Sequence, residues 1–240
     1  MQITMKQITN RNITFTSNES ATSTVTTGII RGVKHNFIID TGTGGDCAQA
    51  MLDYLAAEGS TLPIIVINTH SHWDHVYGNW KFEGKALQII AHKLCPELMN
   101  SRDWAHDVAE LAKDGSIMLG EVHKHLPDKL IDAPLHFAQD GVLIFPNPGH
   151  SPDSISILDE VDKVLYVGDN WGADEDGLSY WGYDESHAEG ASDEEIDALY
   201  DASFFAMMKF LRGYSFETAV LSHGGDVAWT DFVELEDEWE

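Results

Sequence analysis

The stretch THSHWDH, at residues 69–75, places three histidines and one aspartate within six positions, directly after the apolar run PIIVIN. An apolar run of this kind is typical of a buried strand. Residues two apart in an extended segment share a face, so His70 and His72 can reach one ion. Asp74 and His75 follow where the chain is predicted to turn into a helix, so their side chains are available to a second ion. Because neutral imidazole and carboxylate are ligands that zinc and similar divalent metals accept, the stretch predicts a metal site.

Three more residues of metal-ligand type stand at strand ends elsewhere in the chain. His150 follows the apolar stretch GVLIF, Asp169 ends KVLYVGD, and His223 ends ETAVLSH. Each lies next to a glycine, which lets the backbone approach a crowded site. A single histidine at a strand end is usually a surface residue. Four strand ends that all carry such residues indicate one shared site.

Strand and helix patterns alternate along the chain in two similar passes. Runs rich in β-branched and aromatic residues predict strands at residues 7–17, 24–32, 35–42, 62–69, 86–93, 129–137, 141–150, 154–161, 163–170 and 217–226. Apolar residues at helical spacing predict helices at residues 44–60, 96–120 and 192–213, with short ones near residue 74 and after residue 226. In the helix at 192–213, Ser192 and Glu195 form a capping box and Gly213 marks the end. The alternation predicts two sheets packed together with helices outside.

The charge and hydropathy of the chain restrict its partners. Its 40 acidic and 14 basic residues leave a formal net charge of -26. Such a surface repels phosphate backbones, so we expect no nucleic-acid partner. No apolar run approaches the roughly 20 residues of a transmembrane helix, and the N-terminus has no apolar leader pattern. We therefore expect no membrane association.

The two cysteines and the length indicate the compartment and the domain organisation. Cys47 and Cys95 have no paired spacing and are expected to be free thiols in a reducing cytoplasm. No repeat or low-complexity linker divides the 240 residues. We expect one domain over residues 1–240 that is cytoplasmic and acts on a small-molecule substrate, with a homodimer as an open alternative.

The combined motif resembles that of the metallo-β-lactamase fold superfamily, whose signature is H-x-H-x-D-H followed by a distant His, Asp and His. The resemblance spans nearly the whole chain, from the strand that ends at Asp40 to SHGGD. It implies a mixed α/β fold, namely a four-layer αββα sandwich in which two mixed β-sheets are flanked by helices. All seven signature positions are filled here, by His70, His72, Asp74, His75, His150, Asp169 and His223.

The resemblance implies a centre with two divalent metal ions, most simply zinc, with iron or manganese as alternatives. The first ion would be held by His70, His72 and His150, and the second by Asp74, His75 and His223. Asp169 would bridge the two ions. Asp40 would orient a ligand histidine through its carboxylate, although an Asx turn that ends its strand is the structural alternative.

Such a centre implies hydrolysis by a hydroxide held between the two ions. Asp169 and Asp74 are the catalytic candidates, the first as the bridging ligand and the second also as a proton shuttle, and Ser151 is not expected to be a nucleophile. A bridging Asp169 resembles the glyoxalase II, lactonase and phosphodiesterase branches, whereas β-lactamases place Cys or Ser there. Two departures weaken a close glyoxalase identity, since Asp153 replaces a glycine of the turn motif and only 17 residues follow His223.

We therefore expect a hydrolase of a small ester, thioester or lactone. Two enzymatic alternatives remain open, a small-molecule phosphodiesterase and a one-iron persulfide dioxygenase. The dioxygenase would use the first three histidines and Asp169 alone. A non-catalytic metal-binding protein is disfavoured by the complete ligand set.

The substrate pocket is expected in the aromatic stretch at residues 170–190, which lacks a clear helix or strand period. Its rings could form a wall for an apolar acyl group, or they could cover the core beneath a long loop. Trp73 and the helical stretch at residues 100–113 are expected on the other side of the cleft. The candidate pocket residues are Trp73, Trp171, Tyr180, Trp181 and Tyr183.

Overall fold

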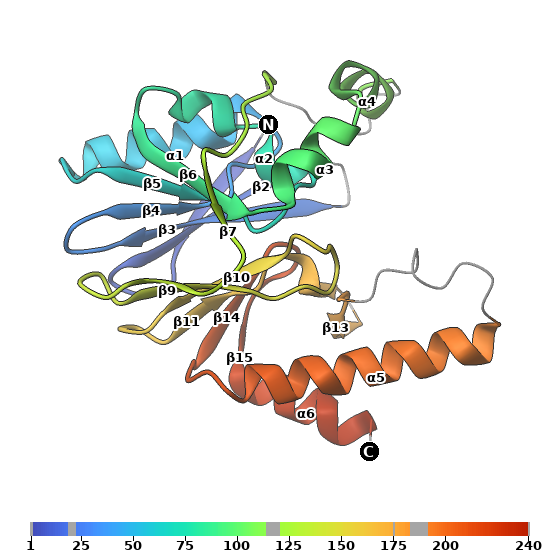
Figure 1. The fold of residues 1–240 in the computed structure, drawn as a ribbon. Helices are drawn as coiled ribbons and strands as arrows, with labels where there is room; N and C mark the ends of the chain where they lie inside the picture. Colours follow the sequence, from blue (N-terminus) through green and yellow to red (C-terminus); the bar gives the residue numbers. More distant parts are fainter. Residues whose placement is uncertain (1, 19–22, 114–120, 175, 183–191, 240) are drawn as a thin grey trace.

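The computed structural model describes residues 2–18, 23–113, 121–174, 176–182 and 192–239, and its strands form two large sheets that face each other (Figure 1). In the N-terminal sheet, β1 to β4 pair in antiparallel fashion and β4 to β7 in parallel, so the sheet is mixed. Its seven strands, in spatial order, are β1 (Ile3–Gln7), β2 (Asn12–Asn18), β3 (Thr24–Arg31), β4 (Asn36–Ile39), β5 (Ile64–Ile67), β6 (Ala86–His92) and β7 (Lys129–Ile131).

The C-terminal sheet is also mixed, because β11 and β14 run parallel while its other neighbours run antiparallel. A separate hairpin is formed by β12 (Trp171–Asp174) and β13 (Gly177–Tyr180). The six strands of the sheet, in spatial order, are β15 (Gly225–Ala228), β14 (Thr218–Leu221), β11 (Val164–Tyr166), β10 (Ile155–Asp159), β9 (Val142–Pro146) and β8 (Leu135–Phe137).

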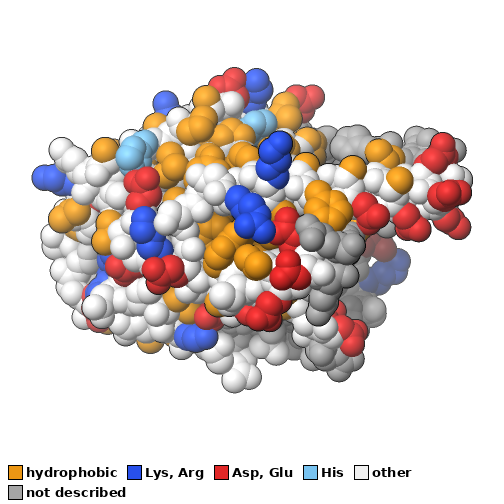
Figure 2. Space-filling view, turned by 90° about the horizontal axis from the view of Figure 1, so that it is seen from below, with side chains coloured by type: hydrophobic (Ala, Val, Ile, Leu, Met, Phe, Trp, Pro, Cys, Tyr) orange, Lys and Arg blue, Asp and Glu red, His pale blue; other side chains and the backbone are white. Residues whose placement is uncertain are grey.

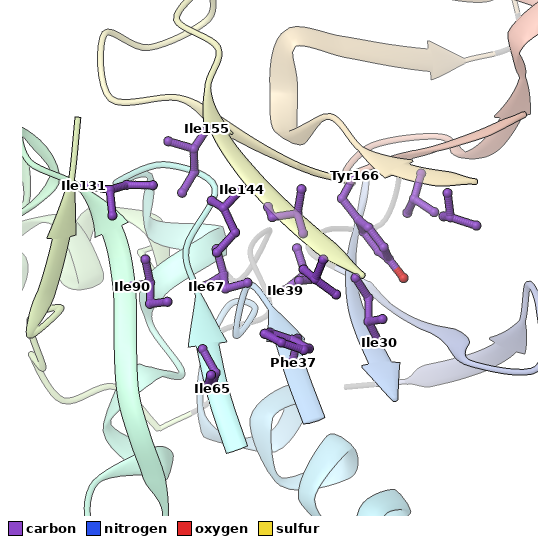
Figure 3. Close-up of a cluster of buried hydrophobic side chains, with 14 residues drawn as sticks. Ile30, Phe37, Ile39, Ile65, Ile67, Ile90, Ile131, Ile144, Ile155 and Tyr166 are labelled. Atoms are coloured by element: carbon purple, nitrogen blue, oxygen red, sulfur yellow. The ribbon is translucent and has the colours of Figure 1, made fainter. Parts of the chain in front are cut away.

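Alternation along the strands sends one set of side chains between the sheets and the other set under the helices. On β5, Ile65 and Ile67 point into the cluster between the sheets (Figure 3). Val66, between them, packs in the cluster under α1 on the outer side. Phe37 on β4 and Tyr166 on β11 join the same inner cluster. Because successive side chains of a strand point to opposite faces, strands buried on both faces are apolar throughout.

The helices cover the outer faces of the two sheets, which completes the four layers. The helix α1 (Gly45–Ala57) packs on the N-terminal sheet through Met51 and Leu55. On the other side, α5 (Asp193–Leu211) and α6 (Trp229–Trp239) cover the C-terminal sheet (Figure 1). The predicted αββα sandwich and the capping box of Ser192 and Glu195 are confirmed.

Several local predictions differ from the structure. The strand predicted at residues 129–137 is two short strands, β7 and β8, which belong to different sheets. The strand predicted at residues 7–17 is split by a turn into β1 and β2. The helix predicted at residues 96–120 is two helices, α3 (Cys95–Ser101) and α4 (Trp104–Leu111), with residues 114–120 outside the described part. Residues 171–174 and 177–180 pair as the β12–β13 hairpin rather than forming an irregular loop, and Gly177, the first residue of β13, adopts a positive φ of 114° that glycine tolerates.

The strand directions bring the polar strand ends to one edge of the sandwich. β9 and β11 are both antiparallel to β10, and β14 is parallel to β11, so these three strands end on the same side. Two backbone hydrogen bonds tie the sheets together at that edge. The amide of Ile155 donates to the Thr69 carbonyl over 2.8 Å, and the amide of Thr26 donates to the Ser222 carbonyl over 2.7 Å.

The surface is acidic and carries no membrane-spanning element in the described ranges. Among those residues, no helix combines the length and the apolar character that crossing a bilayer requires. Figure 2 shows Asp and Glu side chains gathered toward the end of the molecule where α5 begins. The first turn of that helix contains Asp193, Glu194 and Glu195, which suits the positive end of a helix dipole.

Candidate metal centre

The THSHWDH stretch leaves β5 as extended chain and then turns abruptly into a short helix. His72 has an extended backbone (φ -67°, ψ 151°) and stands at the N-cap of α2 (Trp73–Val76). His70 and His72 therefore lie before the turn, and Asp74 and His75 lie in the first turn of the helix. This change of direction separates the two pairs of side chains, as the spacing predicts.

The structure brings all seven signature residues together in two groups that share one member. In each group, every residue offers a ligand atom that lies within 4.8 Å of the others. Asp169 belongs to both groups, and its carboxylate therefore stands between them. The first group is His70, His72, His150 and Asp169, and the second is Asp74, His75, Asp169 and His223.

The distances show how closely the donor atoms converge on Asp169. Its Oδ2 lies 3.5 Å from Nε2 of His70 and 3.6 Å from Nε2 of His150. The same oxygen lies 3.5 Å from Nε2 of His223, while Oδ1 lies 3.2 Å from Nε2 of His75. Four imidazoles, from the ends of β5, β9 and β14, are thus held around one carboxylate.

The donor set fits a pair of divalent metal ions. Nε2 of His70 and Oδ1 of Asp169 are buried and have no hydrogen-bond partner within the described part of the chain. Nδ1 of His72 also faces Nε2 of His150 at 3.1 Å, so two ring nitrogens point at the same space. Burying unpartnered polar atoms is unfavourable, and ligation of a cation would satisfy them.

Burial and charge drive the pKa values of the site histidines apart. Burial and the neighbouring His75 hold the pKa of His70 well below 6.5, and burial together with His150 lowers the pKa of His72 to about 4. Both rings are therefore neutral at pH 7, which is the form that binds metal. Burial alone would lower the pKa of His223, but hydrogen bonds to Asp169 and Asp74 raise it to about 10.

The two carboxylates are held ionised by the same contacts. Burial would raise the pKa values of Asp74 and Asp169, but the charge of His75 and hydrogen bonds from His223 and His75 hold both below 3.8. The pKa of His75 is raised well above 6.5, because the charges of Asp169, Asp74 and Asp40 outweigh burial. Divalent cations would compensate the carboxylates in place of these protons.

Hydrogen bonds from outside the two groups fix the orientation of the rings. Oδ2 of Asp40 lies 2.8 Å from Nδ1 of His75. Asp40 also accepts hydrogen bonds from the amide and the hydroxyl of Thr69, both over 2.7 Å. Asp40 has a φ of 59°, a left-handed conformation that Asp tolerates. The structure therefore places Asp40 against a site histidine.

Backbone carbonyls orient two more rings, and sequence reasoning missed both. Nδ1 of His223 lies 2.7 Å from the carbonyl oxygen of Thr24, and Nδ1 of His150 lies 3.3 Å from that of Trp181. In both rings Nε2 therefore faces Asp169. Metal-binding histidines are usually oriented in this way, by a hydrogen bond at the ring nitrogen that does not bind the metal. Carbonyl partners carry no residue identity, so no sequence signal could have revealed them.

The loop that carries His150 is held by an asparagine that sequence reasoning also missed. Oδ1 of Asn170 accepts a hydrogen bond from the amide of His150 over 2.9 Å, and its Nδ2 donates to the Asn147 carbonyl over 2.8 Å. Asn170 directly follows Asp169. Its position beside a candidate ligand was the only available signal.

The predicted aromatic wall needs correction at two positions. Trp171 is 0% exposed and Tyr180 is 3% exposed, and both belong to the core under α5 and α6. These two side chains are buried and do not line a pocket. Of the two roles expected for the aromatic rings, Trp171 and Tyr180 therefore have the one in which they cover the core. Trp73 is half-buried and packs with Tyr77, with ring centroids 6.0 Å apart.

Trp181 differs from its neighbours, because it lies beside the centre. Its ring centroid is 5.6 Å from that of His223, and both residues line a cavity of about 590 Å³. Tyr183 lies outside the described residues. The cavity is large enough to accept a small-molecule substrate.

Comparisons with known proteins agree with this geometry. Residues 22–223 match the model of the Metallo-beta-lactamase superfamily. The solved structure of TMB-1 superposes with a TM-score of 0.67, covers 99% of both chains and is 17% identical, so it supports the fold alone.

Among curated relatives, the acyl-coenzyme A thioesterase MBLAC2 of Homo sapiens is 24% identical over 163 residues, covering 59% of this chain and 56% of that protein. A shorter stretch of 113 residues is 28% identical to avaE of Aspergillus versicolor, covering 45% of this chain and 33% of that protein. The chain thus spans about a third to somewhat over half of these relatives' lengths.

Proposed function

Because the chain belongs to the metallo-beta-lactamase superfamily, we propose that it is a hydrolase with two zinc ions that acts on a small ester, thioester or lactone. The observation that carries the proposal is the shared position of Asp169 in both ligand groups. One carboxylate between two sets of histidines suits a pair of ions that act on one substrate. The thioesterase MBLAC2, a distant relative, favours the thioester within this class.

The residues of the chain have distinct roles in this proposal. His70, His72 and His150 would hold one ion, Asp74, His75 and His223 the other, and Asp169 both. When bound, two divalent ions lower the pKa of water and polarise the oxygen of the carbonyl that is attacked.

Other groups of the site would position these ligands and handle protons. Asp40 holds the ring of His75, and the carbonyl of Thr24 holds the ring of His223. Asp74 lies 3.3 Å from Nε2 of His223, and its ionised carboxylate can accept a proton and pass it to the leaving group. The chain needs no nucleophile of its own for this chemistry.

The test combines metal analysis with a substrate panel. The zinc-loaded protein is assayed with p-nitrophenyl acetate, an acyl thioester, a γ-lactone and bis-p-nitrophenyl phosphate. We expect two zinc equivalents per chain and turnover of at least one carbonyl substrate. Turnover of the phosphodiester alone would replace the carbonyl proposal by a phosphodiesterase. One tightly bound iron with no hydrolysis would instead point to the one-iron dioxygenase.

Variants connect the activity to the centre. Asp169→Ala and His72→Ala are each expected to lower kcat/KM by about a thousandfold or more, because the ions lose a ligand. The matched control is His136→Ala, an exposed histidine that pairs with Glu160 on the C-terminal sheet. Retained activity in Asp169→Ala, with an intact circular dichroism spectrum, would refute the proposal.

A further inference from the structure

The cavity beside His223 has a distinct chemical character. It holds about 590 Å³, and its wall consists of polar, small and acidic residues around one indole ring. Asp174 and Asp176 supply the acidic groups, and no lysine or arginine is part of the lining that the structure describes. The eight lining residues are Ser23, Thr24, Ala173, Asp174, Asp176, Trp181, His223 and Gly224.

The indole of Trp181 lines this cavity and packs against the hairpin backbone. Its Nε1 donates to Oγ of Ser179 over 2.8 Å. A Cβ added to Gly172 would lie 2.3 Å from the ring, so the indole rests directly on the backbone there. Gly172 in turn forms a parallel β-bridge with His223, so the backbone beneath the indole lies next to that of a candidate ligand.

The two aspartates face the cavity from the turn of the β12–β13 hairpin. Both are exposed, and the amide of Asp176 donates to Oδ1 of Asp174 over 2.9 Å. Asp226, a carboxylate two residues after Gly224, is paired with Lys6 and is not part of the described wall. The described lining therefore presents two carboxylates and contains no lysine or arginine side chain.

An aromatic ring beside carboxylates is the chemistry that recognises an ammonium group. The ring quadrupole attracts a cation over its face, and the carboxylates add charge attraction. The divalent ions of the proposed centre would repel such a group, and the carboxylates of Asp74 and Asp169 at the centre reduce that repulsion. Asp174 and Asp176 supply the further negative charge that a cationic substrate needs near the centre.

We propose that the cavity holds an ammonium group of the substrate, so that the enzyme prefers cationic esters or thioesters to neutral and anionic ones. The predicted substrate preference rests on the proposed hydrolase function. The predicted binding of an ammonium ion does not depend on that function. It differs from a preference for coenzyme A thioesters, which carry several negative charges. An anionic leaving group would be repelled by the same two aspartates.

The experiment uses two substrates of the same shape. Acetylthiocholine and S-(3,3-dimethylbutyl) thioacetate differ only in the replacement of the quaternary nitrogen by carbon. With the zinc-loaded protein we expect kcat/KM to be roughly tenfold higher for the cationic substrate, as the strength of partly exposed cation–π and ion-pair contacts suggests. The double variant Asp174→Asn/Asp176→Asn should lower this ratio several-fold, and Trp181→Leu should lower it further.

A control variant separates local from general charge effects. Asp53→Asn/Asp162→Asn removes two carboxylates that lie outside the cavity wall, and it should leave the ratio unchanged. If both thioesters are hydrolysed with a ratio near one, or if the ratio survives in Asp174→Asn/Asp176→Asn, the inference is wrong while the hydrolase proposal stands.

A binding measurement decides the case in which neither thioester is hydrolysed. Tetramethylammonium chloride is titrated into the protein in a calorimeter, with sodium chloride at matched ionic strength as the reference. Saturable binding that is lost in Asp174→Asn/Asp176→Asn supports the cation site even if the proposed reaction is wrong. No binding by the wild-type protein would overturn the inference.

Discussion

The carboxylate of Asp40 holds Nδ1 of His75 at 2.8 Å, although the two residues come from different strand ends and lie 35 positions apart. The opposite nitrogen of the ring, Nε2, faces Asp169 at 3.2 Å. The orientation of His75 therefore depends on a residue that is not itself a candidate ligand. Carboxylates that hold metal-binding histidines in this way raise the basicity of the ring.

We predict that Asp40→Asn weakens binding of one zinc ion by about 10- to 100-fold and leaves the other nearly unchanged. Asparagine tolerates the left-handed backbone at this position and can still accept the hydrogen bond from the Thr69 amide, so the change removes mainly charge. Competition with a chromophoric chelator measures both affinities. Asp46→Asn, an exposed change in the first turn of α1, is the control. Equal affinities in Asp40→Asn and the wild type would contradict the assigned role.

We predict that removal of the metal lowers the melting temperature by about 10 °C. A ligand at a thousand times its Kd stabilises the folded state by about 4 kcal/mol, and for a chain of this size each kcal/mol shifts Tm by about 2–4 °C. Differential scanning calorimetry with and without a chelator measures the shift, and added zinc should reverse it. His72→Ala/Asp169→Ala should show a much smaller shift. Identical melting curves with and without the chelator would argue against a resident metal.

Asp140 provides a prediction about pH that is independent of the metal centre. It is 2% exposed and joins the two sheets, since its Oδ1 accepts hydrogen bonds from the amides of Val33 and Lys34 and its Oδ2 contacts the ring of His35. Burial alone would raise its pKa, but the hydrogen bonds from His35, Lys34 and Val33 hold it below 3.8. The carboxylate therefore stabilises the fold above pH ~4, and this stability is lost as the pH falls through its lowered pKa.

We predict that Asp140→Asn lowers the free energy of unfolding by about 2–3 kcal/mol at pH 7, as the loss of hydrogen bonds to a buried charge implies. The difference from the wild type should shrink when the pH is lowered below about 4. Urea unfolding at several pH values measures both effects. Asp132→Asn, an exposed carboxylate that pairs with Lys93, is the control and should change stability little. A difference that grows toward low pH would contradict this account.

Ser151, the serine beside His150, is expected to have a structural role rather than a nucleophilic one. Its Oγ donates to Oδ1 of Asp153 over 2.5 Å, and Asp153 is fully buried. We predict that Ser151→Ala destabilises the protein by about 2–3 kcal/mol, because a buried carboxylate loses a donor. Thermal unfolding measures this loss, and Ser101→Ala, an exposed serine on α3, serves as the control. Turnover should persist in Ser151→Ala, and its abolition with metal still bound would point to a serine nucleophile instead.

The fold was predicted well from the sequence alone, because the spacing of the ligand motif restricts how the strands can be arranged. The spacing of His70, His72, Asp74 and His75, with a distant His150, Asp169 and His223, requires strand ends that meet at one edge. Few folds satisfy that requirement, so the resemblance and the strand–helix alternation led to the same sandwich. Long elements such as α5 were predicted almost to the residue, because their caps are written in local sequence.

The substrate side was predicted less well, because exposure is a tertiary property. Trp171, Tyr180 and Trp181 look alike in the sequence, yet the first two are core residues and only the third lies beside the centre. The hairpin alternation that separates them depends on the pairing of β12 with β13, which a single strand does not reveal.

By itself, the sequence determined which side chains are available to bind metal, since ligand chemistry belongs to residue types. Only the tertiary structure decided how these side chains are held and what lies next to them. The carbonyls of Thr24 and Trp181 orient two rings, and Asp174 and Asp176 line the cavity beside His223. Backbone groups are identical at every position, and the acidic character of a wall depends on which distant segments converge there, so neither could be inferred from local sequence.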